Sequence, residues 1–158
     1  MSNMKLHHRM MVAGTIVVGA LGVLLSLTVF FVSVPAAAFQ PPVDLRTHLT
    51  LDIALTEAQQ ELGLGGRTSM PRDHGMLFVF AQSGIYPFWM KGMHFPLDIV
   101  WIQHGVVQDI AHLPPPRTAS STPITYLPHH QADRVLEVDA GVAKALGLTP
   151  GVRVILPD

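Results

Sequence analysis

Hydrophobic and polar residues alternate in short stretches along the chain from residue 49 onward, a pattern that is typical of half-buried β-strands. In residues 49–55, leucine and isoleucine occupy every second position. Short apolar or alternating runs of the same kind predict further strands. These are residues 76–80, 85–91, 97–103, 106–113, 135–138 and 152–156.

Two short helices are predicted between these strands. Thr56 followed by Gln59 has the spacing of a capping box, so we expect a helix to start after Thr56 and to end at Gly63. Asp139 is a suitable N-cap for a second helix, which Gly147 would close.

Residues 104–105, a His-Gly dipeptide, predict a tight hairpin turn because both residue types tolerate a positive φ. In a regular hairpin the residues flanking the turn face each other, and Val100 faces Asp109. Asp98 and Asp109 would then be diagonal neighbours on one face of the sheet. Two such carboxylates either share a proton or a cation, or point into solvent at a sheet edge.

The connections between the strands indicate the fold class. Several strands are joined by hairpins or short loops, which predicts an antiparallel, mainly β domain of the α+β class with two short helices. A length of 158 residues predicts one domain, which we assign to residues 49–158. Residues 114–134 form a long proline-containing loop, either a lid or a surface insertion.

Residues 10–34 form an apolar segment without a charge, which is long enough to cross a bilayer. One lysine and one arginine in residues 1–9 keep that end in the cytoplasm and direct the rest outward. The segment is either a transmembrane anchor or a signal peptide cleaved near Ala38, and its length favours the anchor. Residues 35–48 are expected to be a linker. The domain is therefore predicted at the outer face of the cytoplasmic membrane, or secreted to the periplasm after cleavage.

The charge of the domain argues against a nucleic-acid partner. From residue 39 onward there are eight basic and eleven acidic residues, a formal net charge of −3. A weakly acidic domain does not attract a phosphate backbone. The chain has no cysteine, which excludes disulfides, thiolate catalysis and cysteine-based zinc sites.

Five short motifs follow one another along the domain: GLGGR at 63–67, GMLFVF at 75–80, FWMK at 88–91, PLDI at 96–99 and VLEVDAG at 135–141. In this order and spacing, the domain resembles the bacterial and archaeal family called domain of unknown function 192. The resemblance implies a compact, mainly β fold with a barrel-like or sandwich core, and it implies no reaction. Members usually carry Met-Phe where Gly65 and Gly66 stand here, and a polar residue near Gly92. A pocket at these positions would be altered in this chain.

Four charged residues within these motifs make the first candidate site: Arg67, Lys91, Asp98 and Glu137. If they meet, the two cations bind a carboxylate or a phosphate and the two acids orient them. The alternative is an ion-pair network that fixes the register of the strands. No catalytic residue is assigned by spacing.

Aromatic residues and histidines offer two further candidates. An exposed Trp89 beside Lys91 would suit a sugar or peptide ligand, whereas a buried Trp89 would belong to the core. The seven histidines from residue 39 onward lack the spacing of a metal motif, so neither a metal nor another cofactor is predicted. A metal would need His94, His112 and His129 to converge.

These features favour a membrane-anchored or exported, non-enzymatic binding module for a small anionic ligand or an envelope component. One alternative is a hydrolase that uses Asp98 with Glu137, or Asp98 with Asp109, as acid and base. Another alternative is a structural partner in an envelope complex.

Overall fold

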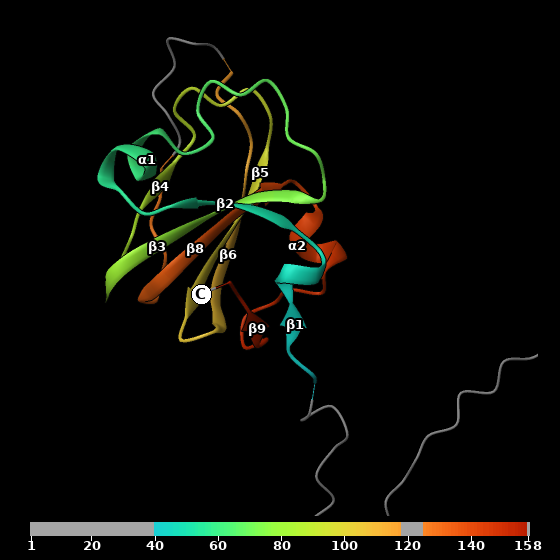
Figure 1. The fold of residues 1–158 in the computed structure, drawn as a ribbon. Coiled ribbons are helices and arrows are strands. Elements are labelled where there is room, and N and C mark those ends of the chain that lie inside the picture. The colour runs from blue at the N-terminus through green and yellow to red at the C-terminus, as the bar shows by residue number, and fades with distance from the viewer. Residues whose placement is uncertain (1–39, 118–124, 158) are drawn as a thin grey trace, which may run out of the picture. The chain divides into compact units, whose positions relative to one another are not determined.

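A computed structural model describes residues 40–117 and 125–157 of the chain. Over these residues it contains nine strands and three short helices (Figure 1). The strands are β1 (Val43–Asp44), β2 (Thr50–Ala54), β3 (His74–Gly84), β4 (Phe88–Trp89), β5 (Leu97–Gln103), β6 (Val106–Leu113), β7 (Thr125–Tyr126), β8 (Ala132–Asp139) and β9 (Val154–Ile155). The helices are the 3-10 helix η2 (Leu45–Thr47) and the α-helices α1 (Glu57–Leu62) and α2 (Val142–Ala145).

The central element is a five-stranded sheet with the strand order β2-β3-β8-β5-β6. β2 runs parallel to β3, and the other three pairs are antiparallel. Two small sheets pair β1 with β9 and β4 with β7. In the described ranges no strand joins β2 to β6, so the sheet stays open. The predicted mainly β class is confirmed, whereas the predicted barrel-like closure and the count of two helices are wrong.

The domain begins earlier than the alternation of hydrophobic residues suggested. Residues 43–47 belong to the range predicted as a linker, yet they form β1 and η2. Val43 donates its backbone N–H to the carbonyl of Arg153 at 2.8 Å, and Leu45 is fully buried. These residues add a small sheet to one side of the domain. Their pairing is with the far end of the chain, which no local pattern reports.

Each face of the five-stranded sheet carries its own hydrophobic core, because neighbouring residues of a strand point to opposite faces. The aromatic core contains phenylalanine, tryptophan and methionine side chains such as Phe78, Phe88, Met90 and Trp101. The aliphatic core contains almost exclusively leucine, isoleucine, valine and alanine. α1 and β4 lie towards one side of the sheet in Figure 1, and α2, β1 and β9 lie towards the other.

The two α-helices start in different ways. At α1 the predicted capping box is confirmed, because Thr56 Oγ1 accepts the N–H of Gln59 and Gln59 Oε1 accepts the N–H of Thr56. At α2 the predicted cap, Asp139, is wrong. The N-cap position is Gly141, which provides no side-chain bond. Asp139 ends β8 instead and pairs with Arg72 at 3.5 Å.

The predicted hairpin turn is confirmed, since His104 and Gly105 have φ values of +49° and +72°. The predicted register is correct only beside the turn. An irregularity between Trp101 and Ile102 places Trp101, rather than Val100, opposite Asp109. The extra residue of β6 therefore turns Asp109 to the face opposite Asp98. The proposed pair of Asp98 and Asp109 is thereby ruled out.

The predictions for residues 1–9, for the apolar segment 10–34 and for cleavage near Ala38 lie outside the described residues, as do residues 118–124 of the long loop. Within the described ranges, none of the helices is long and apolar enough to cross a membrane. The remainder of the long loop contains β7, which pairs with β4.

Candidate functional site

The sheet separates the four charged residues that the sequence grouped together. Strand pairing sets Asp98 opposite Val138 and Ile99 opposite Glu137. Asp98 therefore points into the aliphatic side of the sheet and Glu137 into the aromatic side. The predicted single cluster does not form, and a pair of Asp98 with Glu137 acting on one substrate is ruled out by the same geometry.

Asp98 is buried, with 5% of its surface exposed, and each of its carboxylate oxygens has a partner. Oδ1 lies 2.9 Å from His112 Nδ1. Oδ2 accepts the backbone N–H groups of Gly141 at 2.8 Å and Ala143 at 3.1 Å. Asp98 thus caps α2 from a neighbouring strand, which supplies the cap that Asp139 was expected to provide. Its partners are enough to explain its burial.

Glu137 is equally buried, with 4% exposed, but its Oε2 atom has no hydrogen-bond partner. It lies in a pocket of about 190 Å³. Burial raises the pKa of Glu137 to about 8, and the backbone of Leu64 and the charge of Arg67 act in the opposite direction. At neutral pH the carboxyl group is therefore mainly protonated, and it faces the pocket as a neutral acid.

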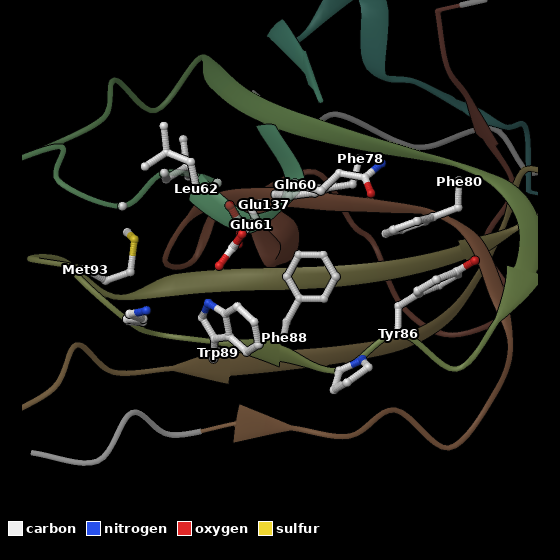
Figure 2. A pocket seen from close by; sticks show the side chains of 15 residues that line it. Gln60, Glu61, Leu62, Phe78, Phe80, Tyr86, Phe88, Trp89, Met93 and Glu137 are labelled. Atoms are coloured by element: carbon white, nitrogen blue, oxygen red, sulfur yellow. The ribbon is translucent and has the colours of Figure 1, made fainter. Parts of the chain in front are cut away.

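The walls of this pocket are mainly aromatic. They consist of Phe78, Phe80, Tyr86, Phe88 and Trp89, together with Leu62, Pro87 and Met93. Phe80 and Tyr86 stack with their centroids 3.6 Å apart, and Phe78 meets Phe88 edge to face at 4.8 Å. Figure 2 shows these side chains around one space, with Leu62 of α1 on the side opposite Phe88. The ring pairs hold the walls in place without a ligand.

The chain after α1 shapes the pocket beside Glu137. Gly63 ends α1 with φ +51°, and a side chain there would come within 3.5 Å of Glu137 Oε2. Gly66 then donates its N–H to the carbonyl of Gly92 at 3.0 Å. The loop before Arg67 thus meets the segment that follows FWMK. The two departures from the family pattern, at 65–66 and 92, also meet here.

The two predicted cations have different surroundings. Arg67 forms an ion pair with Asp52 at 2.7 Å, and both side chains are exposed. It does not line the pocket. Lys91 does line it, is exposed, and has no ion-pair partner among the residues that the structure describes. Of the predicted pair, only Lys91 is placed to meet a ligand in this pocket.

Trp89 is 43% exposed and lines the same pocket, whereas its neighbour Phe88 is buried in the aromatic core. The other tryptophan, Trp101, is fully buried and donates its Nε1–H to the carbonyl of Tyr86 at 2.8 Å. Trp89 is therefore exposed, as the ligand hypothesis requires, and its ligand stays a prediction, whereas Trp101 belongs to the core. Trp89 provides a flat apolar surface at the mouth of the pocket.

The histidines lie apart from this pocket. His112 contacts Asp98, and His129 donates its backbone N–H to Asp109 at 2.9 Å. Asp109 also accepts the hydroxyl of Tyr126. In the described part of the chain, no group of three histidines or acids could hold a metal ion.

Sequence reasoning missed Glu61 and Phe80, which also line the pocket. Phe80 follows Phe78 by two residues in one strand, so strand alternation already placed both rings on one face. Glu61 is one of several polar residues on a short helix, and nothing local distinguished it from its neighbours.

Comparison with known proteins agrees with the fold. The model of a family of unknown function, DUF192, described as "Uncharacterized ACR", matches residues 42–156. No curated protein matches the chain significantly. One similar crystal structure is of a Sinorhizobium meliloti 1021 protein proposed to be a transcription regulator; it is 37% identical with a TM-score of 0.58, over 66% of this chain and 79% of that one. Another is of a protein of unknown function from Novosphingobium aromaticivorans DSM 12444; it is 31% identical with a TM-score of 0.58, over 66% of this chain and 73% of that one.

Proposed function

This chain belongs to the DUF192 family, and we propose that its domain is a non-enzymatic binding module for a small molecule of the cell envelope. The ligand enters the pocket of Glu137 and places an anionic group near Lys91. The domain acts outside the cytoplasmic membrane, where residues 10–34 anchor it or where cleavage near Ala38 releases it.

The unpaired oxygen of Glu137 is the observation that carries this proposal. A buried polar atom without a partner costs about 1–3 kcal/mol, and native proteins keep few such atoms. Here the atom lies in a pocket whose aromatic walls are already in place. A ligand that bonds to it would recover the lost interaction, which is the usual design of a small-molecule site.

One similar protein is proposed to be a transcription regulator, and the charge of the present domain bears on whether its own ligand is a nucleic acid. This domain has more acidic than basic residues from residue 39 onward. Its pocket also has two glutamates and one lysine in its lining. Neither feature favours a DNA backbone, so we propose a small molecule as the ligand rather than a nucleic acid.

Acid–base hydrolysis is a second candidate, because Glu61 and Glu137 line the same pocket. A protonated buried acid beside an exposed carboxylate is the pairing that glycoside hydrolysis uses. Such an enzyme would cleave chromogenic glycosides and lose this activity in both Glu61→Gln and Glu137→Gln. A binding module would not turn over any of these glycosides.

A ligand screen on the full chain tests the proposal. Small envelope molecules, including amino acids, sugars and their phosphates, are added during thermal unfolding, and a bound ligand raises Tm. We expect at least one compound with an anionic group to raise Tm in the wild type and in Lys144→Gln, but less in Lys91→Gln. Lys144 is a matched control because it is exposed and lies outside this pocket. The proposal is lost if no compound raises Tm.

A further inference from the structure

The pocket of Glu137 has a surplus of acidic groups. Its lining contains two carboxyl groups, from Glu61 and Glu137, and one cation, Lys91. Arg67, whose charge reaches Glu137, is held by Asp52 at 2.7 Å. In the described residues, no ion pair with Glu137 is formed. In the described residues, no cation therefore pairs with Glu137, which is the more buried of the two carboxyl groups in the pocket.

The aromatic walls of the pocket also favour a cation. The faces of aromatic rings carry negative partial charge and attract ammonium groups, most strongly where water is excluded. Five aromatic side chains line this pocket beside Glu137 (Figure 2). Tyr86 is held further by its hydroxyl, which donates to the carbonyl of Gln82 at 2.7 Å. A cage of fixed rings around a carboxyl group is suited to an amine or a quaternary ammonium group.

Other ligand classes fit the lining less well. A purely anionic ligand would bring a like charge towards Glu61, and it would oppose the ionisation of Glu137. A purely apolar ligand would leave Glu137 Oε2 without a partner. The pocket volume of about 190 Å³ lies below the usual range of roughly 300–1,000 Å³ for drug-sized ligands, so the buried group is compact.

We propose that the ligand is a small zwitterion, whose ammonium group occupies the aromatic cage against Glu137 and whose anionic group lies at Lys91. This inference rests on the binding function proposed above and specifies its ligand. Lys91 would repel a simple cation, and the anionic end of a zwitterion removes that repulsion.

Binding of such a ligand at pH 7 displaces a proton. Glu137 is mainly protonated in the free protein because burial raises its pKa to about 8. An ammonium group beside it favours the carboxylate, so the carboxyl O–H bond breaks and the proton passes to the buffer. The ligand retains its own charges, and no other bond changes.

Calorimetric titration of the full chain at pH 7 tests this, in two buffers of different ionisation enthalpy. The probes are three zwitterions (glycine, glycine betaine and phosphocholine), one cation (choline), one anion (acetate) and one neutral sugar (glucose). We expect one of the zwitterions to bind at least tenfold more tightly than choline or acetate. Its apparent enthalpy should differ between the buffers, because a proton is released.

Two variants locate the ligand in the pocket. Glu137→Gln should weaken zwitterion binding at least tenfold and abolish the buffer dependence. Glu57→Gln is the matched control, since Glu57 is exposed on α1 outside the pocket lining, and it should bind as the wild type does. Tighter binding of acetate or glucose, or zwitterion binding without proton release, would overturn the inference and leave the binding function standing. Failure of every probe here and of every compound in the thermal screen would overturn both.

Discussion

Asp98 and Glu137 are the two buried charged residues in the described ranges, and they lie on opposite sides of one sheet. Asp98 contacts His112 and caps α2 with its second oxygen. Glu137 has an oxygen without a partner, in an aromatic pocket. Equal burial therefore has two meanings in this domain. The burial of Asp98 is explained by its hydrogen-bond partners in the fold, whereas Glu137 Oε2 has no partner in the described residues.

The largest effect on stability is expected from removing the side chain of Asp98. Asp98→Ala should lower the free energy of unfolding by roughly 4 kcal/mol, because two backbone N–H groups and a histidine lose a buried charged acceptor. Urea unfolding at pH 7 measures this loss. Asp98→Asn is the control, since it keeps one oxygen that can still cap α2, and it should cost less. A loss below about 1 kcal/mol in Asp98→Ala would contradict a structural role.

The next largest effect is the pH dependence of stability that Glu137 causes. The pKa of Glu137 is about 8 in the folded protein and its ordinary value is 4.5. Between these values the folded state holds a proton that the unfolded state releases, so stability falls as pH rises, by at most about 1.4 kcal/mol per pH unit. Over pH 5 to 8 we expect wild type to lose roughly 3 kcal/mol more than Glu137→Gln does. Equal pH profiles for the two proteins would show that Glu137 is ionised when folded.

A smaller change sharpens the account of Asp98. His112→Ala removes one of its partners and leaves the two backbone bonds to α2. Because the side chain of His112 is 62% exposed, the expected loss of unfolding free energy is about 1 kcal/mol. Thermal unfolding of His112→Ala and of Asp98→Ala under the same conditions compares the two losses of stability. If both lose the same stability, the histidine contact rather than the cap explains the burial of Asp98.

The smallest effect is expected at the surface ion pair of Arg67 with Asp52. Both side chains are exposed, so Arg67→Ala should lower stability by less than about 1 kcal/mol, and added salt should reduce that difference. A double-mutant cycle with Asp52→Ala measures the pair directly. A coupling well above 1 kcal/mol would mean that this ion pair holds the loop beside the pocket.

Local signals predicted much of this fold. The strands at 97–103 and 106–113 have the predicted bounds, and Thr56 with Gln59 marked the start of α1, because alternation and capping depend on residues close in sequence. The errors concern contacts between distant residues. β1 pairs with β9, and the cap of α2 comes from a residue more than forty positions earlier. No pattern within a single segment carries that information.

The candidate site was predicted in part for the same reason. Lys91, Trp89 and Glu137 were each named from the sequence, and all three line one pocket. Asp98 was grouped with Lys91 and Glu137 because it is a charged residue within another of the motifs, but its position in β5 turns it to the other face. Alternation says which residues share a face within a strand, and the register between strands says which of these faces coincide.

The position of β8 in the sheet has a consequence for how the domain acquires its structure. β2 and β3 form one half of the sheet and β5 and β6 the other, and the halves are joined only through β8 in the strand order. β8 spans residues 132–139, so it is synthesised after both halves. In a chain emerging from a ribosome, the parallel pair β2-β3 and the hairpin β5-β6 cannot be joined until this strand arrives. The five-stranded sheet can therefore form only after β8, its central strand, has been synthesised. A chain shortened before residue 132 would expose the unpaired edges of β3 and β5 to other chains.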